Sequence, residues 1–174
     1  MSGIGHLAAG FALKPSARQV PLWVLLAAGE TNDILYFAFT AVGIESQAPM
    51  TIDFAHGVTY LSTASNPWSH GLFMSVIWSL LAVGIAFVLT RDRRASGIIG
   101  LAVLSHWLLD FLMHSNLPLF FERSPLLGLG LENSGPGLIF MTALDLLLLG
   151  AGLYIYLRDR KQAPSTPTLG RFLS

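Results

Sequence analysis

Long apolar runs alternate with short polar segments along most of the chain. A helix needs about 20 apolar residues to cross a bilayer, and four runs approach or exceed that length: residues 22–44, 72–90, 97–115 and 137–157. A shorter apolar run covers residues 3–13. At about 1.5 Å per residue, a helix of that length reaches only about half-way through a bilayer. The pattern predicts an all-α polytopic membrane helix bundle with four transmembrane helices and a short N-terminal half-helix.

The polar segments between these runs predict the loops and the domain organisation. A Pro-bracketed turn covers residues 14–21, a long loop covers residues 45–71, and a loop rich in Pro and Gly covers residues 116–136. We expect one membrane-embedded helical domain over residues 1–157. The polar tail at residues 158–174 is expected to be cytoplasmic and disordered.

The positions of the basic residues predict the orientation in the membrane. All Lys and Arg residues except Arg123 fall on one side of a four-span arrangement, in the 14–21 turn, in the RDRR turn at 91–94 and in the C-terminal tail. By the positive-inside rule, this side faces the cytoplasm. The loops at 45–71 and 116–136 are therefore expected to face outward.

The composition supports a membrane protein and narrows its chemistry. Hydrophobic residues make up 53% of the chain and charged residues only 11%, against about 25% charged residues in soluble proteins. Acidic and basic residues balance and no nucleic-acid-binding motif is present, so we expect membrane lipid rather than nucleic acid as the partner. Cysteine is absent, which excludes disulfides and thiolate metal sites.

The apolar run at 97–115 carries three ionisable side chains at helical spacing. His106, Asp110 and His114 follow one another at intervals of four residues, so they share one stripe of an α-helix. Ionisable groups within a membrane are energetically expensive and are usually functional. The stripe therefore marks a candidate site, with His114 at the membrane surface as the simpler interpretation for that residue.

Carboxylates lie in the predicted spans without a fixed positive partner. Glu30, Asp33, Asp110 and Asp145 all fall within spans, and the spans contain neither Lys nor Arg. A buried carboxylate must pair, take up a proton or bind a cation. His and Asp ligands without Cys suit Zn²⁺ best, with Mn²⁺ or Fe²⁺ as alternatives. A His–Asp hydrogen bond that joins two helices is the competing interpretation.

For the remaining polar residues, the sequence predicts a location or a supporting role rather than a site. Asp145, taken alone, is expected to be a packing group or to orient a ligand. Asp53 and His56 lie in a predicted loop and are expected to be exposed to solvent. His6 either reaches bilayer depth on the half-helix or lies near the headgroups on an interfacial helix.

Five motifs together resemble a known group of proteins. They are GHLAAGFALKP at 5–15, GETNDILYF at 29–37, PWSHGLFMSVIWS at 67–79, SHWLLDFLMH at 105–114 and GLGLENS at 128–134. This ordered set resembles small bacterial inner-membrane proteins. Those proteins are similar in turn to the YdjM-like, LexA-regulated membrane proteins, a family of membrane-bound metal-dependent hydrolases.

The resemblance implies a function and a set of metal ligands. It implicates His6, Asp33, His70, His106 and Asp110, and it implies a multi-pass protein of the bacterial inner membrane. The wider family carries Pro-Asp-x-Asp where this chain reads Asn32-Asp33-Ile34-Leu35, so the second acid is missing. A Thr-His-Ser motif of that family becomes Ser69-His70-Gly71 here.

The leading functional hypothesis is a metal-dependent membrane hydrolase that acts on a lipid or a phosphoester. In this hypothesis Glu30 or Asp145 orients ligands or serves as the general base. One alternative is a path for protons or divalent cations through the same acids and imidazoles. Another is a non-enzymatic membrane subunit in which His–Asp pairs only fix the packing of helices.

Overall fold

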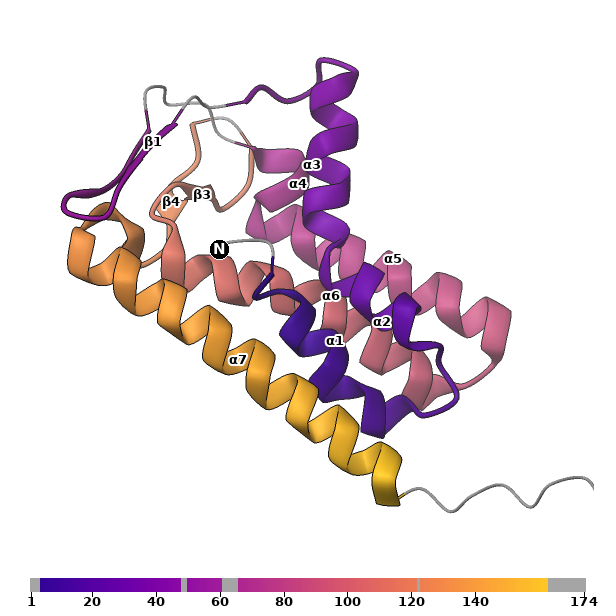
Figure 1. The fold of residues 1–174 in the computed structure, drawn as a ribbon. Helices are drawn as coiled ribbons and strands as arrows, with labels where there is room; N and C mark the ends of the chain where they lie inside the picture. The colour runs from indigo at the N-terminus through magenta and orange to yellow at the C-terminus, as the bar shows by residue number, and fades with distance from the viewer. Residues whose placement is uncertain (1–3, 48–49, 61–65, 122, 163–174) are drawn as a thin grey trace, which may run out of the picture.

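The computed structural model describes residues 4–47, 50–60, 66–121 and 123–162, and these residues form a mostly helical bundle (Figure 1). The helices are α1 (Leu7–Leu13), α2 (Leu22–Gly29), α3 (Thr31–Ala41), α4 (Pro67–His70), α5 (Leu72–Thr90), α6 (Arg93–Met113) and α7 (Gly135–Gln162). Two 3₁₀ turns, η1 (Lys14–Ala17) and η2 (Leu131–Asn133), and four short strands complete the described part.

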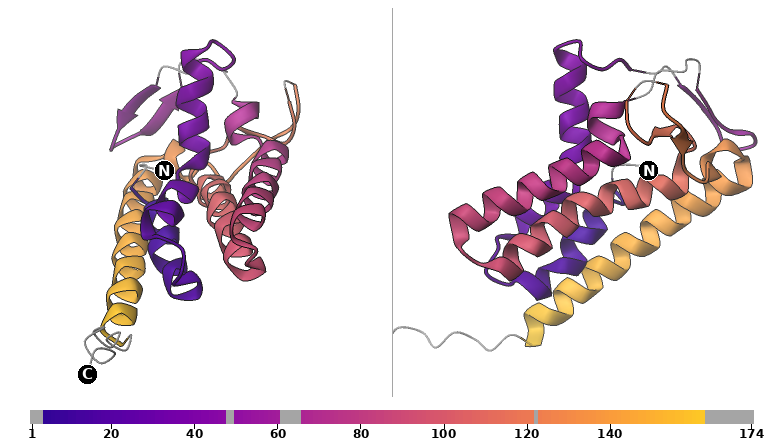
Figure 2. Two further views of the ribbon diagram at one scale, coloured as in Figure 1. Left: turned by 90° about the vertical axis from the view of Figure 1, so that its right-hand side faces the viewer. Right: turned by 180° about the vertical axis from the view of Figure 1, so that it is seen from behind.

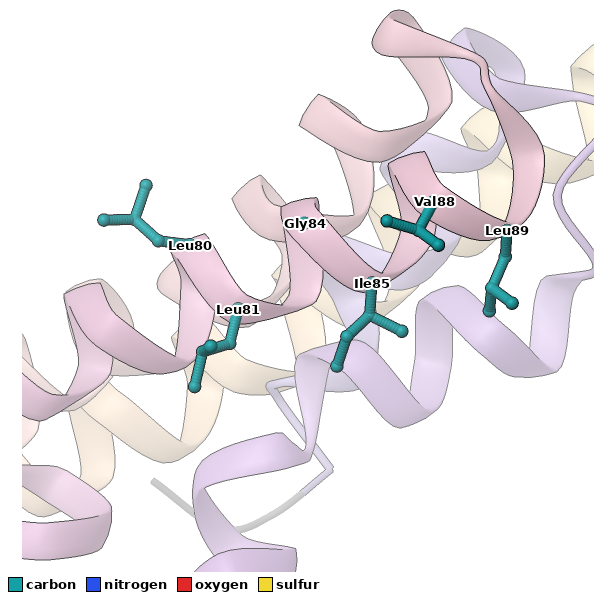
Figure 3. Close-up of a pocket in the computed structure, with 6 residues that line it drawn as sticks. All are labelled: Leu80, Leu81, Gly84, Ile85, Val88 and Leu89. Atoms are coloured by element: carbon teal, nitrogen blue, oxygen red, sulfur yellow. The ribbon is translucent and has the colours of Figure 1, made fainter.

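Three of the described helices are long and apolar enough to cross a membrane: α5, α6 and α7. This finding indicates a membrane protein. The side chains of Leu80, Ile85 and Leu89 on α5 are exposed, which suits contact with lipid rather than water (Figure 3). The second predicted span coincides with α5 at residues 72–90, and the other two long helices begin and end within a few residues of the prediction.

Four full transmembrane helices are not confirmed, because the apolar run at 22–44 forms two shorter helices. α2 and α3 contain 8 and 11 residues and are separated at Glu30, whose φ of −96° and ψ of 6° lie outside the helical region. At about 1.5 Å per residue, neither helix alone spans the bilayer. The carbonyl of Gly29, at this break, accepts a hydrogen bond from the ring of His106.

α1 is a short helix inside the bundle rather than one on its surface. It packs between α7 and α2 (Figures 1 and 2), and His6 at its N-terminal end is buried. Gly29 permits the close approach of the two backbones, because a Cβ atom there would lie 2.9 Å from the carbonyl oxygen of His6. His6 is therefore inside the bundle, and its depth in the membrane stays a prediction.

The long predicted loops contain regular structure, so the fold is not purely α-helical. In the 45–71 segment, β1 (Met50–Asp53) and β2 (Gly57–Tyr60) form an antiparallel hairpin that precedes α4. In the 116–136 segment, β3 (Leu117–Pro118) pairs with β4 (Leu126–Leu127) ahead of η2. The sequence did not reveal these strands because they are short and lie outside the apolar runs.

The two long loops lie at the same end of the bundle, as the predicted topology requires. β2 contacts η2, and α4 contacts β3. The basic turns meet at the opposite end, where Arg18 forms an ion pair with Asp159 of α7 and Gln19 donates a hydrogen bond to Asp92. α7 continues to Gln162, so residues 158–162 of the predicted tail are helical. Residues 163–174 lie outside the described part of the chain.

Candidate metal centre

The centre of the candidate site is the carboxylate of Asp110 on α6. His106 lies one turn earlier and His114 one turn later, immediately after the helix ends. His106 Nε2 is 3.3 Å from Asp110 Oδ2, and His114 Nε2 is 3.6 Å from Asp110 Oδ1. His106 and Asp110 are almost completely buried. The predicted helical stripe is therefore present and faces the interior of the bundle.

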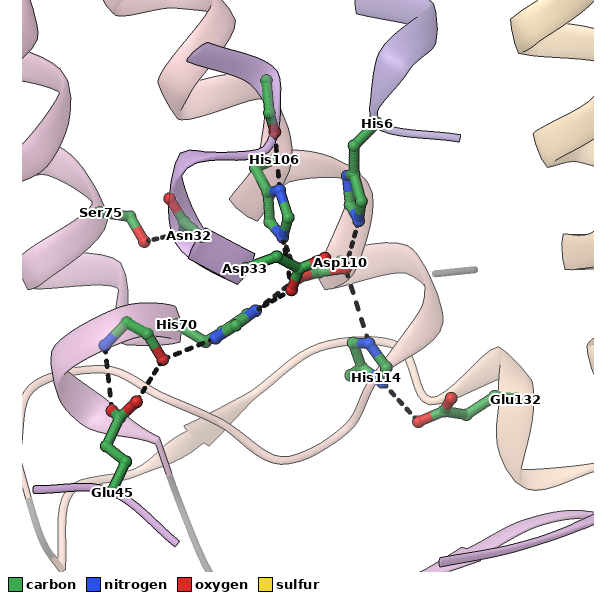
Figure 4. A network of polar contacts seen from close by, with 12 residues as sticks. His6, Asn32, Asp33, Glu45, His70, Ser75, His106, Asp110, His114 and Glu132 are labelled. Carbon is green, nitrogen blue, oxygen red and sulfur yellow. Dashed lines mark hydrogen bonds and ion pairs between the residues drawn. The ribbon is translucent and has the colours of Figure 1, made fainter. Parts of the chain in front are cut away.

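His70 of α4 reaches the same carboxylate from another part of the chain, and Asp33 of α3 faces His70 and His106 beside it (Figure 4). His70 Nε2 lies 3.3 Å from Asp33 Oδ1 and 3.6 Å from Asp110 Oδ2. His106 Nε2 lies 3.7 Å from Asp33 Oδ1. Two imidazole nitrogens and two carboxylate oxygens thus face one another.

His6 joins this group from the N-terminal end of α1. Its ring stacks on that of His106, with centroids 3.6 Å apart and planes 9° from parallel. Its Nε2 atom lies 3.3 Å from Asp110 Oδ1. All five residues that the sequence implicated as ligands are therefore brought together. Donor atoms of two overlapping sets lie close enough to share an ion, namely His6–Asp33–His106 and His70–His106–Asp110.

Hydrogen bonds at Nδ1 determine which nitrogen of two histidines faces the cluster. His106 Nδ1 lies 2.8 Å from the carbonyl oxygen of Gly29, so it carries the hydrogen and donates it. His70 Nδ1 lies 2.8 Å from Ser69 Oγ. Because the Ser69 hydroxyl donates to Glu45 over 2.6 Å, its oxygen accepts from His70. When either ring is neutral, these hydrogen bonds leave the lone pair on Nε2, which faces the cluster as a metal ligand must.

Glu45 and Glu132 are two buried acids that the sequence reasoning missed. Glu45 Oε1 also accepts the backbone N–H groups of Trp68 and Ser69, which fixes the start of α4. Glu132 lies 2.6 Å from His114 Nδ1 and is 1% exposed. Both residues fall in predicted loops. For Glu45 the available signal was an acid in a segment that lacks Lys and Arg, since residues 22–90 contain neither, whereas Glu132 shares its loop with Arg123 and had no such signal.

The distances separate two kinds of contact within the site. The Nδ1 contacts measure 2.6–2.8 Å and are ordinary hydrogen bonds, which span about 2.5–3.2 Å. The Nε2 contacts with Asp33 and Asp110 measure 3.3–3.7 Å, which is long for a hydrogen bond. Ligands about 2.0–2.1 Å from a tetrahedral zinc ion are roughly 3.3–3.5 Å from one another. Three of the six Nε2 contacts match that separation at 3.3 Å, and the other three are slightly longer, at 3.6–3.7 Å.

An ordinary His–Asp pair elsewhere in the chain provides a comparison. Asp53 and His56, on the exposed hairpin, approach to 2.5 Å, and their hydrogen bond raises the pKa of His56 and lowers that of Asp53. Both residues are exposed, as the sequence predicted. The exposed His56–Asp53 pair therefore lies at hydrogen-bond distance, whereas the histidine Nε2 atoms of the cluster lie 3.3–3.7 Å from the oxygens of Asp33 and Asp110.

Asn32 attaches the start of α3 to a long helix. Its side chain is completely buried and donates a hydrogen bond to Ser75 of α5 over 2.9 Å. Because Asn32 directly precedes Asp33, this bond restricts where the Asp33 carboxylate can lie. Asp33 is about one-third exposed, whereas His106 and Asp110 are at most 2% exposed. Asp33 is therefore the most exposed of the clustered side chains.

The two residues predicted to be catalytic stand apart from the ligand sets. Glu30 lies at the α2–α3 break, three residues before Asp33, and its Oε1 atom is buried without a hydrogen-bond partner in the described part of the chain. Asp145 is buried on α7 and belongs to neither set of clustered donor atoms. Their catalytic roles stay predictions.

Comparison with known proteins adds no further information about the site. No protein-family model, no curated protein and no solved structure matches the chain. The function of the protein is therefore inferred from its residues and their geometry.

Proposed function

We propose that this protein is a membrane-embedded, metal-dependent hydrolase with its centre at Asp33, His70, His106 and Asp110. The observation that carries the proposal is the combination of Nε2 atoms at 3.3–3.7 Å from carboxylate oxygens with Nδ1 atoms at hydrogen-bond distance from fixed acceptors. A packing role does not need this arrangement, but a set of metal ligands does.

The donor set favours a divalent ion of intermediate hardness. Two imidazole nitrogens and two carboxylate oxygens, without thiolate, suit Zn²⁺, with Mn²⁺ and Fe²⁺ as alternatives. When bound, such an ion supplies a Lewis acid and lowers the pKa of water toward neutrality. The charge balance supports binding of a cation, because Asp33 and Asp110 lie in two segments without Lys or Arg, residues 22–90 and 95–121.

Residues around the four proposed ligands orient the ligand side chains or serve as a general base. Gly29 and Ser69 hold the rings of His106 and His70 in place. Glu30, whose buried Oε1 has no hydrogen-bond partner among the described residues, is proposed to act as the general base toward water. Asp145 is proposed to help orient the cluster from α7.

An amphiphilic substrate suits the open side of the centre. Asp33 is the most exposed of the four ligands, and Ile34 and Phe37 on the same helix are exposed apolar side chains. A lipid or lipid-like phosphoester can place its apolar part along α3 and its polar part at Asp33. We propose the bacterial inner membrane as the protein's location, with the centre toward the outer face.

Metal analysis of the purified protein tests the proposal. We expect at least one divalent metal ion per chain in the wild type and loss of at least half of the bound metal in His106→Ala, because a buried ligand is removed. His56→Ala, which changes the exposed histidine, is the matched control and is expected to keep the wild-type content. A metal-free wild type, or unchanged content in His106→Ala, would contradict the proposal and favour a packing role.

A further inference from the structure

Two cavities adjoin at the basic end of the bundle, away from the metal centre. The first, the apolar groove, has a volume of about 420 Å³ and lies between α2, α5 and α6. Ala95 and Ile99 of α6 line this groove, whereas His106 and Asp110 belong to the metal centre further along the same helix. The second, the basic pocket, has a volume of about 430 Å³. It is lined by Pro15, Ser16, Arg18, Gln19 and Arg94.

The groove and the pocket meet at two points of the chain. Gln19 lines both cavities. Arg94 lines the basic pocket, and the next residue, Ala95, lines the apolar groove. Each volume is within the range of about 300–1,000 Å³ that small-molecule sites occupy. A single molecule that fills both cavities must therefore join an apolar part to a polar part that can bind arginine.

The charges around the basic pocket favour an anion. The two turns at this end contain five Lys or Arg residues and one acid, Asp92. Asp92 already caps the N-terminus of α6, and Asp159 of α7 is paired with Arg18. The side chain of Arg94 is exposed, and among the described residues no ion pair joins it to a carboxylate. Its guanidinium can therefore hold a phosphate through two parallel N–H groups.

The position of the cavities along the helices suits a lipid. α5 ends at Thr90 and α6 begins at Arg93, so the turn between them marks where these two apolar helices leave the bilayer. Trp23, near the start of α2, is 70% exposed, as is typical of Trp at a membrane–water interface. The groove then lies at the depth of acyl chains. Ile85 and Leu89 border both the groove and the outer face of α5 (Figure 3), along which a second acyl chain can lie.

We propose that an anionic phospholipid of the cytoplasmic leaflet binds here, with one acyl chain in the apolar groove and its phosphate at Arg94 in the basic pocket. Basic pockets between membrane-spanning helices on the cytoplasmic side are known to bind anionic headgroups. A second copy of the chain fits less well, because a symmetric pair with one orientation in the membrane would bring the same basic turns against each other. This inference does not depend on the proposed function.

Lipid retention by the purified protein tests this site. The protein is delipidated in a neutral detergent, incubated with equal amounts of phosphatidylglycerol and phosphatidylcholine that carry the same acyl chains, and analysed by native mass spectrometry. We expect one phosphatidylglycerol per chain, preferred about fivefold or more, which is the factor that one arginine near anionic lipid contributes. Arg94→Gln is expected to lose this preference. Arg93→Gln is the matched control and is expected to keep it, because Arg93 is an exposed cation of the same turn that is not among the residues lining the pocket.

A variant of the apolar groove tests where the acyl chain lies. Ala82 lines the groove, so the ring introduced by Ala82→Phe is expected to occupy the space of the chain and to lower the retention of both lipids. Unchanged retention in this variant would contradict the placement of the acyl chain.

The wild-type protein decides the question even where a variant does not fold. Equal retention of the two lipids overturns the site, because it would show only the lipid that surrounds any membrane protein. Equal losses in Arg93→Gln and Arg94→Gln also overturn it, since general attraction between charges would explain both. A lipid-free dimer would assign the groove to a second copy of the chain. Arg94→Gln is expected to keep its metal content, so failure of this inference leaves the proposed function standing, and the reverse also holds.

Discussion

At the residue scale, the chemistry depends on which nitrogen of each imidazole faces Asp110. That choice is made by groups outside the ligand set, such as the carbonyl of Gly29 and the hydroxyl of Ser69. Partners of this kind commonly change metal affinity by about 10–100-fold when they are removed. Ser69 is the most informative of them because it connects His70 to the buried Glu45.

Removal of the Ser69 hydroxyl is therefore expected to weaken metal binding without removing a ligand. For Ser69→Ala we expect a loss of about 10–100-fold in metal affinity, measured by competition with a chelator of known affinity. Ser96→Ala removes another buried serine hydroxyl, one that only bonds the backbone of its own helix, and is expected to leave the affinity unchanged. Ser69→Thr, which keeps a hydroxyl, should restore much of the binding. Equal losses in both alanine variants would point to general destabilisation.

At the scale of elements, the break between α2 and α3 determines where Asp33 lies. A continuous helix over 22–44 would need the Gly29 carbonyl for its own hydrogen-bond ladder, whereas here that carbonyl accepts a hydrogen bond from His106. The break also brings the Gly29 backbone against that of His6. A single local interruption thus joins α1, α2 and α6 around the centre.

A methyl group at position 29 is expected to disturb this junction. In Gly29→Ala the new Cβ atom would lie 2.9 Å from the His6 carbonyl oxygen, and such overpacking costs roughly 1–3 kcal/mol of stability. We expect a lower unfolding midpoint in detergent together with reduced metal content. Gly84→Ala is the matched control, because nothing lies within 4 Å of a Cβ there and alanine favours a helix by about 0.5–1 kcal/mol. A neutral Gly29→Ala would show that the close approach is not required.

At the scale of the whole molecule, the two ends of the bundle differ in charge and in structure. The basic turns and the end of α7 lie together at one end, and both hairpins lie at the other. Cysteine is absent from the sequence, so single cysteines can report the orientation without any background. The positive-inside rule predicts that the hairpin end faces outward.

Labelling of intact cells with a membrane-impermeant thiol reagent tests this orientation. Thr51→Cys, on the exposed hairpin, is expected to react in intact cells. Arg160→Cys, at the exposed end of α7, is expected to react only after the membrane is permeabilised. The reverse pattern would place the metal centre toward the cytoplasm and would contradict the proposed topology.

Local patterns predicted much of the fold and part of the site. The apolar runs located α5, α6 and α7 because burial in lipid requires a long uninterrupted stretch of apolar residues. The interval of four residues placed His106, Asp110 and His114 on one face because helical spacing is local. The resemblance, rather than any spacing, supplied His6 and His70. Neither source indicated that Glu45 and Glu132 orient histidines, since these contacts join distant residues of the chain.

The sequence by itself determined that the chain is helical, apolar enough for a membrane, and charged at depth with acids and imidazoles but without fixed cations. Only the tertiary structure decided that Asp33, His70 and His6 meet at Asp110, that the first apolar run breaks at Glu30, and which ring nitrogens face inward. The physical reason is that helical periodicity relates only residues that are a few positions apart in the sequence. Convergence depends on contacts such as that between His106 and Gly29, 77 residues apart, which form only when the helices pack.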